Sequence, residues 1–301
     1  MNTIIKDLDL NEKSIKKLLD FYASVFKKTP LSYFEKRIKN DPFLQKGDIK
    51  IIEVNGKIIS SITIFRRKLN KGNHKGVLIG GIANVGTKKE ERGKGFSSLL
   101  LKNAINYIKE KNFSCSLLFT GINSFYEKIG FKNIKTKHAI VKIKKKRNLK
   151  WKIETFSEKY MTEIKKLYDF FNEKLPGTVI RDDSYWHANL KFKEDDEIFL
   201  IAVKNSNIGG YLRAVKESPK GIVWEFGFYD REAFEDLLLQ LSNLLKKEII
   251  PFACLLHSPV IPDSEIYSVE YRLSSLPMIF KIKEKEDEIE KQFNFWWTDN
   301  F

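Results

Sequence analysis

The chain has 301 residues, of which 42% are hydrophobic, 13% aromatic and 31% charged, and its formal net charge is +15. This composition excludes a disordered chain, and the length favours two domains of about 150 residues each. No apolar run reaches the roughly 18 residues that span a bilayer, and the N-terminal segment has acidic residues where a signal peptide is apolar. We therefore expect a soluble, cytoplasmic protein that does not enter a membrane.

The positive charge suggests nucleic acid or an anionic membrane surface as a partner. The lysines are nevertheless spread along the chain among acidic residues, and the one dense basic run is at 142–147. This distribution favours a lysine-rich background, with attraction for an anionic cofactor, over polyanion binding. Cys115 and Cys254 lie in apolar runs, and neither they nor the four histidines have metal-ligand spacing. We expect no metal ion.

The first half of the chain, residues 1–146, is predicted to form an α/β unit with a mixed sheet. Apolar residues at helical spacing predict the helices, and Asn55-Gly56 predicts a two-residue hairpin turn. The predicted elements, in chain order, are a strand at 3–8, a helix that Asn11 opens, strands at 50–54, 58–65 and 76–86, a helix at 96–111, a strand at 114–119, a short helix at about 124–129 and a closing strand at 139–143.

The second half, residues 151–301, follows a predicted linker at 144–150 and repeats this order. Its predicted elements are a helix at 158–175, strands at 197–204, 210–216 and 221–229, a helix at 231–247 and a strand at 252–257. The order recurs without evident sequence identity. It therefore indicates a duplicated fold whose second copy has diverged.

The segment at 90–95 reads EERGKG and lies between a predicted strand and a predicted helix. A helix N-terminus binds anions because its first N–H groups are unpaired and its dipole end is positive. Gly93 and Gly95 would let a phosphate approach the backbone, and Arg92 and Lys94 add positive charge. The segment lacks the Gly-Lys-Ser/Thr ending of a Walker loop, and it does not open a dinucleotide-binding βαβ unit. By itself it predicts a phosphate site.

Three segments together resemble the GNAT acetyltransferase superfamily. The loop matches that family's Gln/Arg-x-x-Gly-x-Gly/Ala pattern, except that Glu90 stands where the family has Gln or Arg. Residues 80–87, GGIANVGT, are similar to the central strand that pairs with the pantetheine arm of coenzyme A, and residues 125–131, FYEKIGF, to a Tyr-Glu-Lys-x-Gly-Phe signature. The match covers about residues 50–135. Because the loop contacts are mostly backbone N–H groups, the Glu90 carboxylate costs little if it points to solvent.

Residues 80–85, the segments at 118–120 and 125–126 and, in the second half, the pair at 185–186 and residues 209–211 resemble the tandem-GNAT acetyltransferases related to the enhanced intracellular survival protein. This chain is too short for their full sterol-carrier-like third domain. The resemblance implies two GNAT-like domains in tandem, the second degenerate, and an acetyl-CoA site in the first. It assigns the cofactor to Ala83, Asn84, Val85, Glu91, Arg92, Gly93, Lys94, Gly95, Phe96, Gly121 and Ile122. The equivalent loop of the second half, around Asp230, has carboxylates instead of glycines and is expected to repel a pyrophosphate.

The resemblance also implies catalytic roles. It places Tyr126 beside the cofactor sulfur as the general acid, and backbone N–H groups near Asn84 and Val85 would polarise the thioester carbonyl. The strand at 76–86 has no carboxylate to act as the base. In tandem relatives and in N-myristoyltransferases the terminal carboxylate reaches the active site, which implies the α-carboxylate of Phe301. The alternative is an aromatic tail that packs between the domains while a water chain acts as the base.

We therefore expect acetyl transfer from acetyl-CoA to a primary amine of a small molecule or a peptide. Two alternatives stay open: a tRNA-dependent aminoacyl transferase of the Fem-like type, against which the intact glycine loop argues, and a non-catalytic CoA-binding protein. Nucleic acid is not the expected partner, and a homo-oligomer stays open. A pocket for polycationic acceptors would need carboxylates, and the candidates are Glu35, Asp41, Asp182 and Asp183.

Overall fold

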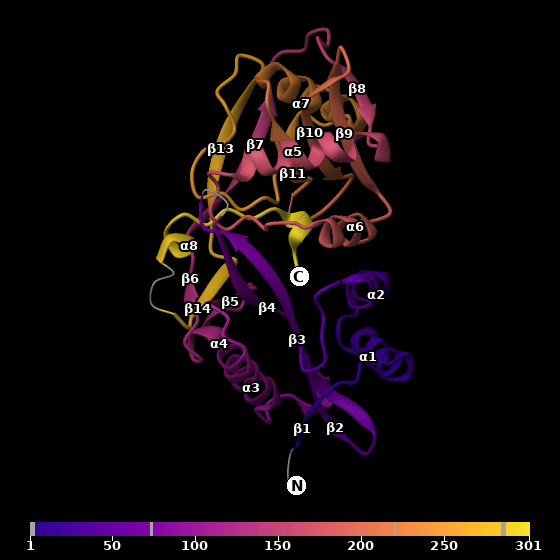
Figure 1. Ribbon diagram of the computed structural model, residues 1–301, viewed down its shortest axis with the longest axis vertical. Coiled ribbons are helices and arrows are strands. Elements are labelled where there is room, and N and C mark those ends of the chain that lie inside the picture. Colours follow the sequence, from indigo (N-terminus) through magenta and orange to yellow (C-terminus); the bar gives the residue numbers. More distant parts are fainter. Residues whose placement is uncertain (1–3, 73–74, 220, 284–286) are drawn as a thin grey trace.

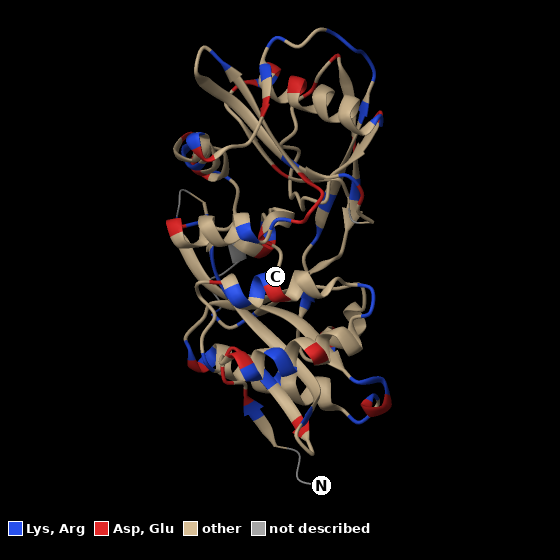
Figure 2. Ribbon diagram, turned by 90° about the vertical axis from the view of Figure 1, so that its right-hand side faces the viewer, with Lys and Arg blue, Asp and Glu red and all other residues tan. Residues whose placement is uncertain are grey.

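The computed structural model describes residues 4–72, 75–219, 221–283 and 287–301, so Thr3 of the first predicted strand lies outside the described residues. The molecule is elongated and consists of two stacked halves, with the C-terminus between them (Figure 1). Lysine, arginine and acidic residues occur in both halves, so the positive charge is not gathered in one of them (Figure 2). Among the described residues no helix has the length and apolarity needed to cross a membrane.

The first half is built on a seven-stranded mixed sheet in the order β1-β2-β3-β4-β5-β14-β6. The strands are β1 (Ile5–Asp7), β2 (Ile49–Val54), β3 (Lys57–Asn70), β4 (Gly76–Thr87), β5 (Cys115–Phe119), β6 (Lys132–Asn133) and β14 (Pro277–Lys281). The helices lie on opposite faces of the sheet, α1 (Glu12–Val25) and α2 (Leu31–Asn40) on one and α3 (Phe96–Glu110) and α4 (Asn123–Glu127) on the other (Figure 1). The expected mixed α/β architecture is confirmed.

Local sequence signals explain several of these elements. The side chain of Asn11 caps α1 by accepting a hydrogen bond from the backbone N–H of Ser14 over 2.9 Å. Asn55 and Gly56 both have positive φ, 49° and 73°, as a two-residue hairpin turn requires. The predicted hairpin between β2 and β3 is therefore confirmed.

The second half contains two smaller sheets, in the orders β11-β10-β9-β8 and β12-β7-β13. Their strands are β7 (Thr136–Ile143), β8 (Lys152–Thr155), β9 (Glu197–Lys204), β10 (Asn207–Val215), β11 (Val223–Phe228), β12 (Ile249–Pro251) and β13 (Tyr267–Ser274). A parallel bridge between Val223 and Phe252 joins the two sheets. The remaining helices are α5 (Met161–Asn172), α6 (Asp183–Lys191), α7 (Arg231–Leu245) and α8 (Asp287–Lys291).

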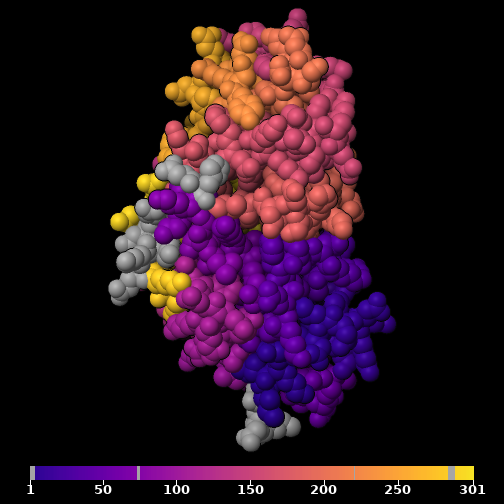
Figure 3. Space-filling view, in the orientation of Figure 1, coloured from indigo at the N-terminus to yellow at the C-terminus, as the bar shows by residue number. Residues whose placement is uncertain are grey.

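The two halves exchange strands. β7, which was expected to close the first sheet, pairs instead with β12 and β13 of the second half. The place between β5 and β6 is taken by β14, which arrives from the end of the chain. Figure 3 shows this C-terminal part, in yellow, against the first half. The expectation that residues 139–143 complete the first unit is wrong, because the local pattern defines a strand but not its partner.

The predicted division into domains at 1–146 and 151–301 stays a prediction. Each half of the structure contains a strand from the other range, because β7 pairs with strands of the second half and β14 with strands of the first. The predicted linker at 144–150 has no regular element. The strand predicted at 252–257 is wrong, since β12 ends at Pro251 and only isolated bridges follow. Several helices and strands of the described residues have no counterpart in the sequence prediction, namely α2, β6, β8, α6, β12, β13, β14 and α8.

One hydrophobic cluster connects the halves. It combines Leu69 and Ile79 of the first sheet with Tyr185 of α6 and with Phe295 and Phe301 of the C-terminal tail. All five side chains are less than 9% exposed. The halves are therefore packed together through a shared apolar core on the α1 and α2 face of the first sheet.

Candidate functional site

The centre of the candidate site is β4, whose ladder is broken at Asn84. Its register with β3 shifts between the pairs Ser61↔Gly86 and Thr63↔Ala83, and Asn84 has a φ of 52°. The parallel pairing with β5 ends at Gly81↔Leu117, and no described strand pairs with β4 on that side afterwards. A bulge beside an unpaired edge leaves backbone groups free to bind a ligand. The implied cofactor residues Ala83, Asn84 and Val85 lie on this segment.

The loop at 90–95 forms an open cradle at the start of α3. Gly93 and Gly95 both have a φ of 81°, and a Cβ added at either would meet no atom within 4 Å. Gly95 is the N-cap and offers no side-chain acceptor, and the backbone bond from Leu99 to Gly95 is 3.0 Å long. The preceding N–H groups of the helix therefore have no intrahelical acceptor.

A cavity of about 290 Å³ lies in front of this cradle. Its lining comprises Thr87, Glu91, Arg92, Gly93, Gly95, Phe96, Ser97, Ser98 and Phe125. The Arg92 guanidinium donates to the Thr87 carbonyl over 3.2 Å, and Lys94 forms a 2.8 Å ion pair with Glu91. Open glycines, unpaired donors and positive charge fit a pyrophosphate group. Glu90 is exposed and lines a different cavity, next to the end of α1, so its carboxylate lies away from the cradle.

Tyr126 lies on α4 and is only 8% exposed. Its ring packs edge to face on Phe125, with centroids 4.9 Å apart, and on Phe131. Burial raises the pKa of Tyr126 to about 12, so the phenol keeps its proton at neutral pH. Gly121 and Ile122 precede this helix and are exposed, with Ile122 at 64%. Phe125 connects α4 to the cradle cavity, which it helps to line.

The C-terminal Phe301 docks on the same sheet. It is 6% exposed, and its ring lies on the face of Gly81, where an added Cβ would be 2.6 Å from a ring carbon. Its ring centroid is 5.3 Å from that of Phe119 on β5 and 6.5 Å from that of Phe65 on β3. The tail therefore reaches the point where β4 and β5 separate, on the face opposite α3 and α4.

Tyr22 is a further residue at the bulge, and the sequence indicated only a core position for it. Its hydroxyl lies 2.8 Å from the Thr63 hydroxyl. Burial raises its pKa to about 12, against smaller opposing effects of hydrogen bonds with Thr63, Ser61 and Asn84. The helical spacing gave no signal for this contact, because Thr63 lies 41 residues further along the chain.

The four carboxylates considered for a polycation pocket are each engaged elsewhere. Asp41 is buried and accepts from Arg67 over 2.5 Å, and Asp182 caps α6 through the Tyr185 N–H. Glu35 and Asp183 form ion pairs with lysines. Glu35 and Asp41 line one cavity together with Glu12, but two lysines line it as well, and Asp182 and Asp183 are not part of it, so the four carboxylates do not form a single acidic pocket. Within the described residues no group of three or more His, Cys, Asp or Glu has the arrangement to hold a metal ion.

The corresponding helix start in the second half is closed. Asp230 is the N-cap of α7 and accepts from the Ala233 N–H over 3.0 Å, as the sequence predicted. Asp236, fully buried, accepts from the backbone N–H groups of Lys150 and Trp151 over 2.6 and 2.8 Å. Asp230 thus binds one N–H group of the helix start itself, and the negative charge of these carboxylates opposes the binding of an anion there.

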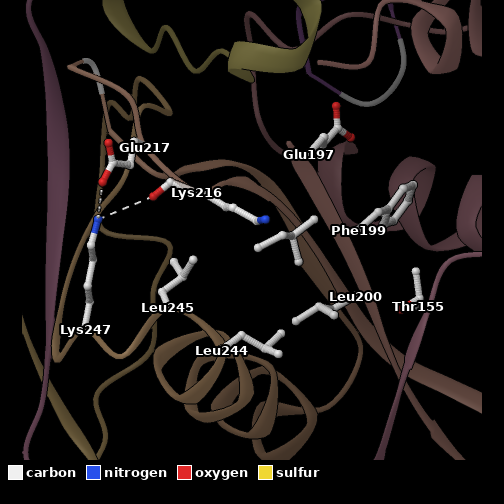
Figure 4. Close-up of a pocket in the computed structure, with 10 residues that line it drawn as sticks. Thr155, Glu197, Phe199, Leu200, Lys216, Glu217, Leu244, Leu245 and Lys247 are labelled. Carbon is white, nitrogen blue, oxygen red and sulfur yellow. Dashed lines mark hydrogen bonds and ion pairs between the residues drawn. The ribbon is translucent and has the colours of Figure 1, made fainter. Parts of the chain in front are cut away.

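A cavity of about 660 Å³ in the second half lies at the other end of α7 (Figure 4). Leu244 and Leu245 of that helix line it, and Lys247 beside them contacts the Lys216 carbonyl and the Glu217 carboxylate. It is therefore far from the capped start of the helix, and its lining does not resemble the glycine cradle.

Comparisons with known proteins agree with this geometry. Residues 9–134 match the family model described as an acetyltransferase (GNAT) domain. No curated protein matches the chain. Among solved structures it is similar to a probable N-acyltransferase from Enterococcus faecalis V583, with 15% identity over 95% of this chain and 74% of that chain and a TM-score of 0.72.

Two further solved structures are similar. A GCN5-related N-acetyltransferase from Anabaena variabilis ATCC 29413 has 15% identity, covers 94% of this chain with 74% of its own length, and gives a TM-score of 0.71. Eis1 from Mycobacterium abscessus has 13% identity, covers 93% of this chain with 73% of its own length, and gives a TM-score of 0.63. These likenesses show the fold, and the family model agrees with the resemblance to GNAT acetyltransferases that the sequence shows in its first half.

Proposed function

We propose that this chain, whose residues 9–134 match the model of a GNAT acetyltransferase domain, transfers an acetyl group from acetyl-CoA to a primary amine. The observation that carries this proposal is the open cradle at Gly93 and Gly95, next to the unpaired edge of β4. Tyr126 supports it from α4, whose Phe125 lines the cradle cavity. The cradle, the edge of β4 and Tyr126 would each contact a different part of one acetyl-CoA molecule.

The binding roles follow from the free groups. The glycine cradle and the first N–H groups of α3 would hold the pyrophosphate, with Arg92 and Lys94 adding charge. The edge of β4 at residues 83–85 would pair with the pantetheine arm as an added strand. Gly121 and Ile122 would contact the arm from the α4 side. The bound donor would supply a thioester whose C–S bond breaks as a C–N bond to the amine forms.

The chain's own groups would move the protons. Backbone N–H groups near Asn84 and Val85 would stabilise the negative charge that develops on the carbonyl oxygen. The phenol of Tyr126, which is protonated at neutral pH, would give its proton to the departing sulfur. The α-carboxylate of Phe301 would accept the proton that the amine nitrogen loses. The acceptor is a small-molecule or peptide amine.

The donor and the reaction are tested together. Purified protein is mixed with acetyl-CoA and a panel of primary amines, and free thiol is measured with and without amine. Amine-dependent thiol release is expected, together with acetyl-CoA binding in calorimetry. Binding without release for any amine would favour a non-catalytic CoA-binding protein, and absence of binding would overturn the proposal.

The base is tested by adding one glycine after Phe301. This addition moves the terminal carboxylate by one residue while the buried ring stays in the sequence. We expect kcat to fall by roughly 100-fold, as for loss of a general base, with little change in the affinity for acetyl-CoA. An unchanged kcat with unaltered stability would leave a water chain as the base.

A further inference from the structure

The last residues of the chain are held by both halves of the molecule. A short helical turn, Trp297–Asp299, precedes Asn300 and the buried Phe301. Only two residues therefore separate Asp299 from the chain end. Whatever fixes Asp299 and Asn300 also fixes where the terminal carboxylate can lie, because a two-residue overhang has little reach.

Asp299 is held by a buried arginine of the second half. Arg181 donates from Nε to Oδ1 of Asp299 over 2.9 Å and from Nη2 to Oδ2 over 2.8 Å, and both side chains are 0% exposed. Asn189 of α6 adds hydrogen bonds to the Thr298 carbonyl, 2.9 Å, and to Asp299, 3.2 Å. Bidentate hydrogen bonding of this kind fixes the orientation of the Asp299 carboxylate as well as its distance from the guanidinium.

The arginine is itself held by β11. Arg181 donates to Glu225 over 3.1 and 2.7 Å, and Glu225 is also fully buried. Tyr211 donates to the same carboxylate over 2.8 Å, and Arg213 lies 3.7 Å from it. Buried charges are costly unless each has a partner, so this network has one well-defined arrangement. It connects the sheet of the second half to the tail.

Asn300 is held from the opposite side by the first half. Arg37 of α2 donates from Nε to the Asn300 carbonyl, and the Asn300 amide donates to the Tyr33 hydroxyl, each over 3.3 Å. The last residue then meets Gly81, where an added Cβ would lie 2.6 Å from the Phe301 ring. The two halves thus hold consecutive residues immediately before the chain end.

We propose that Arg181 is a positioning residue that, through Asp299, holds the terminal carboxylate of Phe301 at the point where β4 leaves β5. This inference rests on the proposed function, in which that carboxylate is the base. The second half, whose own helix start is closed, would then serve the reaction by setting the place of a group that belongs to the site of the first half.

The test uses Asp299→Asn in the full chain. This variant removes the charge that Arg181 grips, while Arg181 keeps Glu225 as a partner. We expect carboxypeptidase A to release Phe301 at least ~10-fold faster than from the wild type, because the buried tail detaches more often. We expect kcat to fall by ~10- to 100-fold with the dissociation constant of acetyl-CoA unchanged within about twofold.

Asp48→Asn is the matched control. Asp48 is also fully buried and bound by an arginine, with Arg66 donating to it twice over 2.8 Å, but it lies at the start of β2 and does not touch the tail. It should lower stability comparably, while the release of Phe301 and kcat stay at wild-type values. Where Asp299→Asn does not fold, Arg181→Lys keeps the charge but loses the bidentate hydrogen bonding, and it should give the same two changes.

A second readout separates positioning from general destabilisation. In the chain lengthened by one glycine, Asp299→Asn should cause no further loss of kcat, since the base is already displaced. Full additivity of the two losses would overturn the proposal. So would an Asp299→Asn variant whose Phe301 is as protected as in the wild type. The carboxypeptidase experiment decides the holding of Phe301 even if the chain transfers no acetyl group, which would overturn the proposed function alone.

Discussion

The two halves of the molecule contain the same pair of elements, a strand followed by a fifteen-residue helix, but with opposite chemistry at the junction. In the first half, a loop connects β4 to α3. The N-cap of α3 is Gly95, which has no side chain that could accept hydrogen bonds from the first N–H groups of the helix. In the second half, β11 leads to α7, and the side chain of its N-cap Asp230 accepts a hydrogen bond from the Ala233 N–H group of that helix. A few side chains at the junction therefore separate the proposed anion site from a structural helix start.

The strands that precede these two helices, β4 and β11, also differ in their side chains. β4 has a bulge at Asn84 and no carboxylate, whereas β11 carries Glu225, which is fully buried and bound by Arg181. The carboxylate of the second sheet is thus used for structure. In our proposal, the first sheet takes its carboxylate from the chain end, which the second sheet holds in place. In this proposal, a half of the molecule without an open anion site still supports the site of the other half.

The largest effect is expected from cutting the halves apart. A chain that ends after residue 146 lacks β14, which pairs with both β5 and β6 of the first sheet. The apolar surface of β5 would then be exposed, and we expect complete loss of a cooperative unfolding transition in urea, measured by circular dichroism. The full chain should unfold in one transition. A truncated chain that unfolds cooperatively would support the predicted boundary and contradict the dependence on the exchanged strand.

The second prediction transfers the closed helix start into the first half. Gly95→Asp should weaken acetyl-CoA binding by about 100-fold, ~2.7 kcal/mol, because its carboxylate would bind the N–H groups of α3 and repel the pyrophosphate. Calorimetry measures the dissociation constant. Gly95→Asn is the control for backbone strain, which any side chain introduces at the φ of 81° that Gly95 adopts. Asn has the same shape as Asp but carries no charge. Equal losses for the two variants would show that charge plays no part.

The third prediction concerns the acid. Tyr126→Phe should lower kcat by roughly 100-fold, the lower end for loss of a general acid, and leave acetyl-CoA affinity unchanged. Tyr107→Phe on α3, whose hydroxyl donates to Asp48 over 3.0 Å, is the control and should keep kcat. An unchanged kcat in Tyr126→Phe would leave the phenol a packing role.

The pH dependence of this variant sharpens the assignment. A phenol is an acid only below its pKa, and burial raises the pKa of Tyr126 to about 12. The ratio of wild-type kcat to that of Tyr126→Phe should therefore stay constant from about pH 7 to about pH 10. A ratio that falls between about pH 9 and pH 10 would mean that the phenol ionises there and is not shielded by burial.

The smallest effect is expected in the second half. Asp230→Ala removes the cap of α7 and should lower the free energy of unfolding by about 1 kcal/mol, measured in urea. The affinity for acetyl-CoA should not change, because this helix start lies outside the proposed site. Any acetyl-CoA bound at a second site in this variant would mean that the carboxylate alone had closed an otherwise competent cradle.

The features predicted correctly from the sequence depend on neighbouring residues. The hairpin at Asn55-Gly56, the Asn11 and Asp230 caps and the contrast between the two loops each involve residues a few positions apart. The sequence placed the aromatic tail either at the active site or between the domains, and its aromatic side chains are buried. α2 was not predicted because its short stretch has no side-chain N-cap bond. β14, PMIFK, is a short run without alternation, whereas β13, YSVEYRLS, alternates strictly between apolar and polar residues, so its strand signal was present in the sequence and was missed.

The sequence by itself thus determined the glycine cradle, the closed start of α7 and the presence of a buried tail. The tertiary structure alone decided which sheet each strand enters and what holds the tail. The reason is separation along the chain: Arg181 and Asp299 are 118 residues apart, and β14 pairs with a strand that ends at Phe119. Such partners are selected by burial and by the pairing of charges in the folded molecule, which local patterns do not encode.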